Sequence, residues 1–80
     1  MATKHDLGTW IVECLQTAGG SAPLIDICRY VWENHEVELR RSGDLFLTWQ
    51  YDIRWAATAL RHGGVLKGAR NSPSGVWELA

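Results

Sequence analysis

The chain has 80 residues, a formal net charge of −1 and two cysteines, so residues 1–80 are expected to form one domain around a single small core. The sequence shows no paired carboxylates, nucleophile with a base, glycine-rich phosphate loop or metal-ligand spacing, so we expect neither an enzyme nor a cofactor or metal site. Cys14 and Cys28 lie in apolar, helix-like stretches, which favours reduced core thiols over a disulfide. No signal peptide or membrane-length apolar run is visible, so we expect a soluble, cytoplasmic protein.

The charge is unevenly distributed along the chain. Residues 1–38 hold two basic and six acidic side chains, whereas residues 39–80 hold six basic and three acidic ones. A basic half is typical of proteins that bind nucleic acid, and acidic residues most often keep a protein soluble. The glutamates Glu33, Glu36 and Glu38 could also meet the basic half of a second copy of the chain.

The first helix is predicted from Lys4 to about Ala18, because the apolar residues of this stretch recur at spacings of three and four. The pair Gly19-Gly20 ends it, since glycine adopts the left-handed conformation that commonly follows a helix. Residues 21–24, Ser-Ala-Pro-Leu, favour a short strand at a sheet edge, where the missing N–H of proline costs no ladder hydrogen bond.

A second helix is predicted from about Leu24 to His35, with its apolar side chains facing inward. Residues 36–47 are then predicted to form an irregular connection. Val37 and Leu39 alternate with polar residues as in a strand, and the Ser-Gly-Asp sequence that follows is a turn signal.

A third helix is predicted from Thr48, whose hydroxyl would cap it, to about His62. At about 100 degrees per residue, its inner face consists of Trp49, Ile53, Ala56, Ala57 and Leu60. Its outer face consists of Gln50, Tyr51, Arg54, Thr58 and Arg61. These donors suit phosphates and base edges, although an ordinary solvated face can have the same composition.

The end of the chain predicts a β-hairpin. Val65-Leu66 and the run from Val76 to Leu79 are strand-like, and the loop between them is rich in glycine, serine and other turn residues. The complete order is helix, strand, helix, helix, strand, strand. This order predicts an α+β winged-helix fold: three helices plus a short strand and a C-terminal two-stranded wing. In such a fold the third helix enters the major groove of DNA and the wing lies along the backbone.

The second half of the chain also resembles the amino-terminal winged-helix domain of Mrr-type restriction proteins. The matching residues are Trp55-Ala56, Leu60, Gly64-Val65-Leu66 and Gly75-Val76-Trp77, with a weaker match in residues 19–31. The resemblance covers about three quarters of the chain. It implies a DNA-binding module of a restriction system or of transcription regulation. In the family this domain is joined to a nuclease domain, which these 80 residues do not contain, so no nuclease activity is expected.

The predicted interface with double-stranded DNA has three parts. The third helix supplies Gln50, Tyr51, Arg54, Thr58 and Arg61, the wing supplies Lys67 and Arg70, and the connection before the helix supplies Arg40 and Arg41. Arg40 and Arg41 are equally well explained as solvated residues. Asp52 is expected to oppose DNA from the start of the helix, although a carboxylate there also complements the helix dipole.

Three of the five tryptophans carry predictions of their own. Trp55 lies on the flank of the third helix and is predicted to pack against the wing near Trp77, or else to serve as a stacking or partner-binding surface. A homodimer would use the first helix with an exposed Trp10 or Trp32, because one small winged helix gives limited affinity for DNA. The alternative function is a winged helix for protein–protein interaction or dimerisation with little DNA affinity, which the near-neutral net charge favours.

Overall fold

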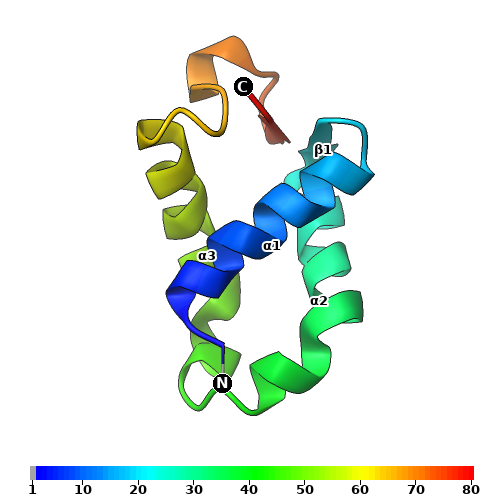
Figure 1. The fold of residues 1–80 in the computed structure, drawn as a ribbon, viewed down its shortest axis with the longest axis vertical. Helices are drawn as coiled ribbons and strands as arrows, with labels where there is room; N and C mark the ends of the chain where they lie inside the picture. Colours follow the sequence, from blue (N-terminus) through cyan, green and yellow to red (C-terminus); the bar gives the residue numbers. More distant parts are fainter. Residues whose placement is uncertain (1) are drawn as a thin grey trace.

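The computed structural model describes residues 2–80, which form three α-helices and a small antiparallel sheet. In chain order the elements are α1 (Lys4–Thr17), β1 (Ser21–Pro23), α2 (Leu24–Arg40), α3 (Leu45–His62), a 3-10 helix (Ala69–Asn71) and β2 (Val76–Glu78). α1 crosses in front of α2 and α3, and the sheet lies at one end of the molecule (Figure 1). The predicted α+β class is confirmed, and the layout is compatible with a winged helix. Within residues 2–80, no helix has both the length and the apolar character needed to cross a membrane.

α1 begins and ends close to the predicted positions. Its first turn is held by Asp6, whose carboxylate accepts a 2.8 Å hydrogen bond from the amide of Thr3. After the helix, Gly19 has a φ of 85°, and the amide of Gly20 donates a 2.7 Å hydrogen bond to the carbonyl of Leu15. This combination is a Schellman motif, so the glycine pair ends the helix as predicted.

α2 is longer than predicted. It continues to Arg40 through a local break at His35, whose φ of −131° and ψ of 17° are not helical. The predicted end coincides with this break, but the next residues form a further helical turn, so the prediction of an irregular connection is wrong there. A 2.8 Å ion pair from Arg40 Nε to Glu36 supports that turn. Val37 is exposed and Leu39 is fully buried, because the two residues lie on opposite sides of the turn.

α3 begins at Leu45, three residues before the predicted cap. The side chain of Leu45 is part of the hydrophobic core, which favours this early start. Thr48 is therefore inside the helix, where its hydroxyl donates a 2.6 Å hydrogen bond to the carboxylate of Asp52. The predicted capping role of Thr48 is wrong, and the residue that precedes the helix is Asp44.

The sheet pairs β1 with β2 in antiparallel register, with Ser21 opposite Glu78. The other arm of the predicted hairpin contributes one bridge, between Leu66 and Leu79. A 2.9 Å hydrogen bond from the amide of Lys67 to the carbonyl of Glu78 extends it. The two arms are thus adjacent as predicted, but the longer pairing of β2 is with β1, and the 3-10 helix occupies part of the predicted flexible tip.

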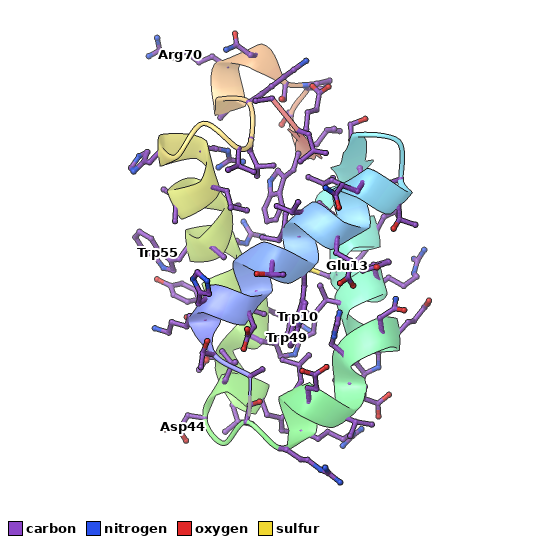
Figure 2. The ribbon with its side chains drawn as sticks, in the orientation of Figure 1. Trp10, Glu13, Asp44, Trp49, Trp55 and Arg70 are labelled. Carbon is purple, nitrogen blue, oxygen red and sulfur yellow. The ribbon has the colours of Figure 1, made fainter. Side chains whose placement is uncertain are left out.

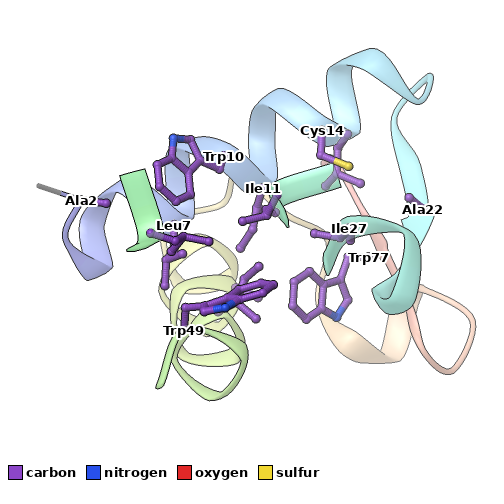
Figure 3. Packing of buried hydrophobic residues seen from close by; sticks show 14 of the residues in the cluster. Ala2, Leu7, Trp10, Ile11, Cys14, Ala22, Ile27, Trp49 and Trp77 are labelled. Atoms are coloured by element: carbon purple, nitrogen blue, oxygen red, sulfur yellow. The ribbon is translucent and has the colours of Figure 1, made fainter. Parts of the chain in front are cut away.

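The three helices and β2 enclose one hydrophobic core (Figure 3). Its largest fully buried side chains are Leu7, Ile11, Leu15, Ile27, Val31, Leu39 and Ile53. Trp10, Trp49 and Trp77 are also buried. Burying a large apolar side chain contributes about 1.5–3 kcal/mol, so the tryptophans enlarge what a chain of this size can bury.

The burial of Trp10 contradicts a dimer that depends on its exposure. Its indole stacks on the imidazole of His35, with ring centroids 4.0 Å apart. Trp32 is half-buried, and its ring centroid lies 6.4 Å from that of Phe46 and 6.3 Å from that of Trp49. Trp10 therefore offers no exposed surface for the predicted contact, whereas the homodimer itself stays a prediction.

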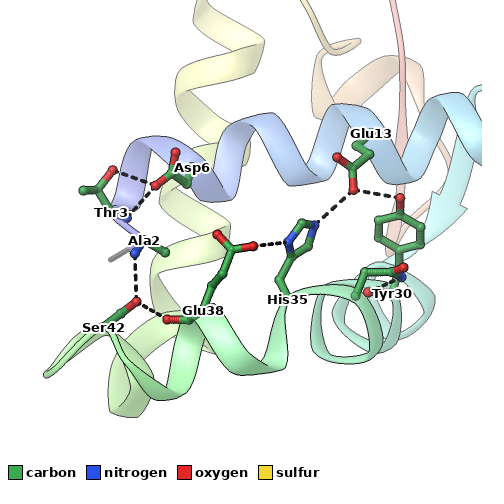
Figure 4. Close-up of polar contacts among 9 residues, drawn as sticks. Ala2, Thr3, Asp6, Glu13, Tyr30, His35, Glu38 and Ser42 are labelled. Atoms are coloured by element: carbon green, nitrogen blue, oxygen red, sulfur yellow. Dashed lines mark hydrogen bonds and ion pairs between the residues drawn. The ribbon is translucent and has the colours of Figure 1, made fainter.

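A polar cluster links α1 to the break in α2 (Figure 4). The carboxylate of Glu13 lies 3.0 Å from Nε2 of His35 and accepts a 2.8 Å hydrogen bond from the hydroxyl of Tyr30. The other ring nitrogen of His35 lies 3.2 Å from the carboxylate of Glu38. The contact with His35, and after it the one with Tyr30, holds the pKa of Glu13 below its ordinary value. Part of the acidic charge of the first half therefore fastens α1 to α2.

Both cysteines are free, as predicted. Cys14 is buried and Cys28 is half-buried at the edge of the core. Burial raises the pKa of both thiols, because an apolar environment disfavours the thiolate.

Candidate nucleic-acid interface

The outer face of α3 carries the predicted polar side chains. Gln50, Tyr51 and Arg54 are exposed, and Thr58 and Arg61 are half-buried. The opposite face carries the buried residues Leu45, Trp49, Asp52, Ile53 and Ala57. Because side chains four residues apart share a helix face, Gln50, Arg54 and Thr58 form one polar stripe along α3. The predicted division of this helix into an inner and an outer face is confirmed.

Asp52 does not reach that outer face. Its side chain is buried, accepts the hydrogen bond from Thr48, and lies 3.7 Å from the Nζ of Lys4 in α1. The prediction that Asp52 opposes DNA is wrong, because α1 packs over the start of α3. Asp52 is the single acidic residue of α3. The only carboxylate of this helix is therefore buried, whereas Arg54 is exposed to solvent.

Arg61 joins α3 to the C-terminal loop. Its guanidinium carbon lies 5.7 Å from the ring centroid of Trp77, a cation–π distance. Beside this contact is a hollow of about 340 Å³, lined by Arg61, Trp77, Ala69 and the loop residues 72–76. The hydroxyl of Ser72 is buried there and has no hydrogen-bond partner among the described residues. Sequence reasoning missed Ser72 and Ser74 as lining residues, because it took this loop only as a flexible tip.

The two predicted wing cations differ in their surroundings. The Nζ of Lys67 lies 3.8 Å from the carboxylate of Glu78 in β2, so its charge is partly compensated. Arg70 is exposed on the 3-10 helix and extends from the end of the molecule (Figure 2). The structure therefore places Arg70 where a phosphate can approach it freely.

Arg40 and Arg41 lie at the other end of the molecule, where α2 ends, far from the 3-10 helix (Figure 1). The guanidinium of Arg40 already makes contacts within the protein. Besides its ion pair with Glu36, its guanidinium lies over the rings of Trp32 and Phe46, at 5.3 and 5.4 Å from their centroids. The structure does not bring these arginines together with the wing residues.

Trp55 does not pack against the wing. Its side chain is 60% exposed and points away from α3 at the edge of the molecule (Figure 2). Its neighbour is Tyr51, one turn earlier on the helix, with ring centroids 6.4 Å apart in an edge-to-face arrangement. The predicted contact with Trp77 is wrong, because Trp77 is buried and Arg61 lies over its ring.

A groove of about 570 Å³ runs between α1 and α3, on the other side of Trp55 from the polar stripe. Its apolar lining includes Gly8, Val12, Ala56, Leu60 and Val65. Within residues 2–80, no three His, Cys, Asp or Glu side chains are grouped so that they could hold a metal ion.

Comparison of the chain with protein-family models, with curated proteins and with solved structures finds no match. The resemblance to the Mrr-type domains therefore depends on the residues that carry it, and it stays a prediction.

Proposed function

We propose that this chain is a winged-helix module that binds double-stranded DNA, with α3 in the major groove and the loop before β2 along the backbone. The order of the elements supports the winged-helix assignment, as does the small sheet in which β1, β2 and Leu66 meet. The predicted resemblance to a DNA-binding domain of restriction proteins agrees with it.

The main support for this proposal is that α3 exposes basic side chains and buries its acidic one. A helix that enters a DNA groove must offer hydrogen-bond donors, and an exposed carboxylate would repel the phosphates. α3 exposes Arg54 and half-exposes Arg61, while its single carboxylate, Asp52, is buried against Thr48 and Lys4. The molecule has a net charge of only −1, yet this helix turns a basic face outward.

The residues of the stripe have complementary roles in this proposal. Arg54 can donate two N–H groups to a guanine edge, and Gln50 can pair with an adenine edge. Thr58 donates its hydroxyl to the carbonyl of Arg54 within the helix at 3.1 Å, so its main contribution is a small surface that permits close approach. Arg61 and Arg70 would contact the phosphates on either side of the hollow beside the wing.

The test is a fluorescence-anisotropy titration of a random-sequence duplex at low and at near-physiological salt. We expect micromolar or tighter binding that weakens with salt, because phosphate contacts release counterions. The double variant Arg54→Ala/Arg61→Ala should weaken binding to this mixed sequence and reduce the salt slope by about 1 for each lost phosphate contact, since two cations are removed. Circular dichroism and thermal denaturation are needed to establish that the variant is folded, because Arg61 also lies over the ring of Trp77.

The matched control is Arg40→Ala/Arg41→Ala, which removes the same charge at the other end of the molecule. We expect it to bind the duplex nearly as well as the native protein does, after correction for any loss of folded protein. Equal weakening by both double variants would show that general charge attraction, not α3, causes the binding. Absence of binding at low salt would refute the function itself.

A protein-interaction module is the second candidate, and a different observation favours it. Leu47, Tyr51 and Trp55 lie one turn apart on α3 and are 81%, 63% and 60% exposed, and a contiguous exposed apolar patch is typical of partner contacts. Sedimentation equilibrium over a range of concentrations tests the homodimer form of this candidate. A stable dimer that Leu47→Gln dissociates, with no duplex binding, would support this function over the first.

A further inference from the structure

Two aromatic side chains stand uncovered beside the polar stripe of α3. Tyr51 is 63% exposed and Trp55 is 60% exposed, whereas Trp10, Trp49 and Trp77 are buried and Trp32 is half-buried. The fold therefore buries or half-buries four of the five tryptophans, including Trp49 on the inner face of α3, and leaves Trp55 exposed on the outside of the same helix.

The geometry leaves ring faces open. The rings of Tyr51 and Trp55 meet at an interplanar angle of 61°. An edge-to-face contact uses the edge of one ring and one face of the other, so the remaining faces are turned to solvent, in agreement with the exposed fractions. The pair therefore forms a small aromatic platform on the outside of α3.

Paired DNA makes poor use of such a platform. The grooves of a duplex present base edges and thymine methyl groups, while the base faces are stacked on one another. Unpaired bases present their faces, and proteins that bind single strands combine aromatic rings for stacking with nearby positive charge. Arg54 lies between Tyr51 and Trp55 in the sequence and is exposed on the same helix. Among residues 2–80, no carboxylate lies within ion-pair distance of it.

We infer that the aromatic platform binds unpaired bases, so that the preferred substrate is a duplex with a single-stranded extension or an unpaired base. On such a substrate Arg54 would turn from a guanine edge to the phosphates of the unpaired nucleotides, whose bases stack on Trp55 and Tyr51. This inference rests on the proposed function, because it assigns a substrate class to the same helix. The shared chemistry is an unpaired nucleobase, which either DNA or RNA can provide.

The experiment compares three probes by fluorescence anisotropy: a blunt duplex, the same duplex with an oligothymidylate overhang, and the same duplex with an oligouridylate overhang. We expect at least one overhang to bind about fivefold or more tightly than the blunt duplex, as one stacked base can provide. The overhang that gains more identifies DNA or RNA as the source of the unpaired bases.

Variants of Trp55 locate the effect. Trp55→Ala should remove the preference for the overhang and leave blunt-duplex binding unchanged, whereas Trp55→Phe should keep most of it, since a phenyl ring still stacks. Addition of the overhang should quench the tryptophan emission of the native protein but not that of Trp55→Phe. The matched control is Val37→Ala, which truncates an apolar side chain of similar exposure, 62%, on α2, and it should retain the preference.

Equal affinity for blunt and extended duplexes would overturn the inference and leave duplex binding standing. A preference for the overhang that survives Trp55→Ala would also overturn it, because the unpaired bases would then bind elsewhere. If no probe binds and Trp55→Ala instead dissociates a dimer in sedimentation, the platform is a protein contact, and both the inference and the DNA-binding function fail.

Discussion

Gly8 lies in the middle of α1, where the helix passes over α3, and replacing it by alanine should stabilise the fold. A methyl group added at Gly8 would lie 3.9 Å from the side chain of Leu60, which is ordinary van der Waals contact and not a clash. Glycine inside a helix costs about 1 kcal/mol relative to alanine. We therefore expect Gly8→Ala to raise the free energy of unfolding by about 1 kcal/mol and the Tm by about 4–8 °C, measured by circular dichroism during thermal and urea denaturation.

The same substitution at Gly19 provides the control and should have the opposite sign. No atom lies within 4 Å of a methyl group placed there, but the residue has a φ of 85°. An alanine in that left-handed conformation costs about 1–2 kcal/mol. If Gly8→Ala instead destabilises the protein as much as Gly19→Ala does, α1 and α3 approach each other more closely than the structure has them, and the reasoning is refuted.

Two further predictions concern buried or paired carboxylates. Because the folded state holds the pKa of Glu13 below its ordinary value of 4.5, ionised Glu13 stabilises the fold above that pH, and the contribution is lost as the pH falls through the folded-state pKa. Urea denaturation of the native protein and of Glu13→Gln should differ at neutral pH, and the difference should shrink as the pH falls below 4.5; a difference that does not change with pH would contradict this. Thr48→Ala should cost about 1–3 kcal/mol, since the buried carboxylate of Asp52 loses a hydrogen-bond donor. Thr58→Ala removes a hydroxyl bonded only to a helix carbonyl and should change the free energy of unfolding by no more than about 0.5 kcal/mol. Equal losses of stability in both variants would show that the hydrogen bond to Asp52 does not stabilise the fold more than the bond of Thr58 does.

The sequence allowed the elements with strong local signals to be predicted. α1 ends at its glycine pair because Gly19 takes a conformation that other residues avoid. The outer face of α3 follows from helical periodicity alone. The order of the elements needed no knowledge of packing, since each is bounded by glycine, proline or a turn.

The parts that could not be predicted depend on contacts between distant residues. α2 continues past His35, and Leu39 reaches the core beyond the break. The break shifts the helical periodicity of the buried residues, and no local sequence pattern predicts that shift. Trp55 lies exposed beside Tyr51, whereas Arg61 lies over the buried ring of Trp77. Propensity and periodicity describe one element at a time, so they do not contain these contacts.

The character of the candidate interface is decided largely by α1, which lies outside it. Lys4 approaches Asp52 and thereby helps to take the negative charge of α3 away from its surface. Without α1, α3 would expose a carboxylate two residues from Arg54. An exposed carboxylate there would reduce the positive potential of this face, so residues of the first half of the chain determine the charge of the candidate interface through packing.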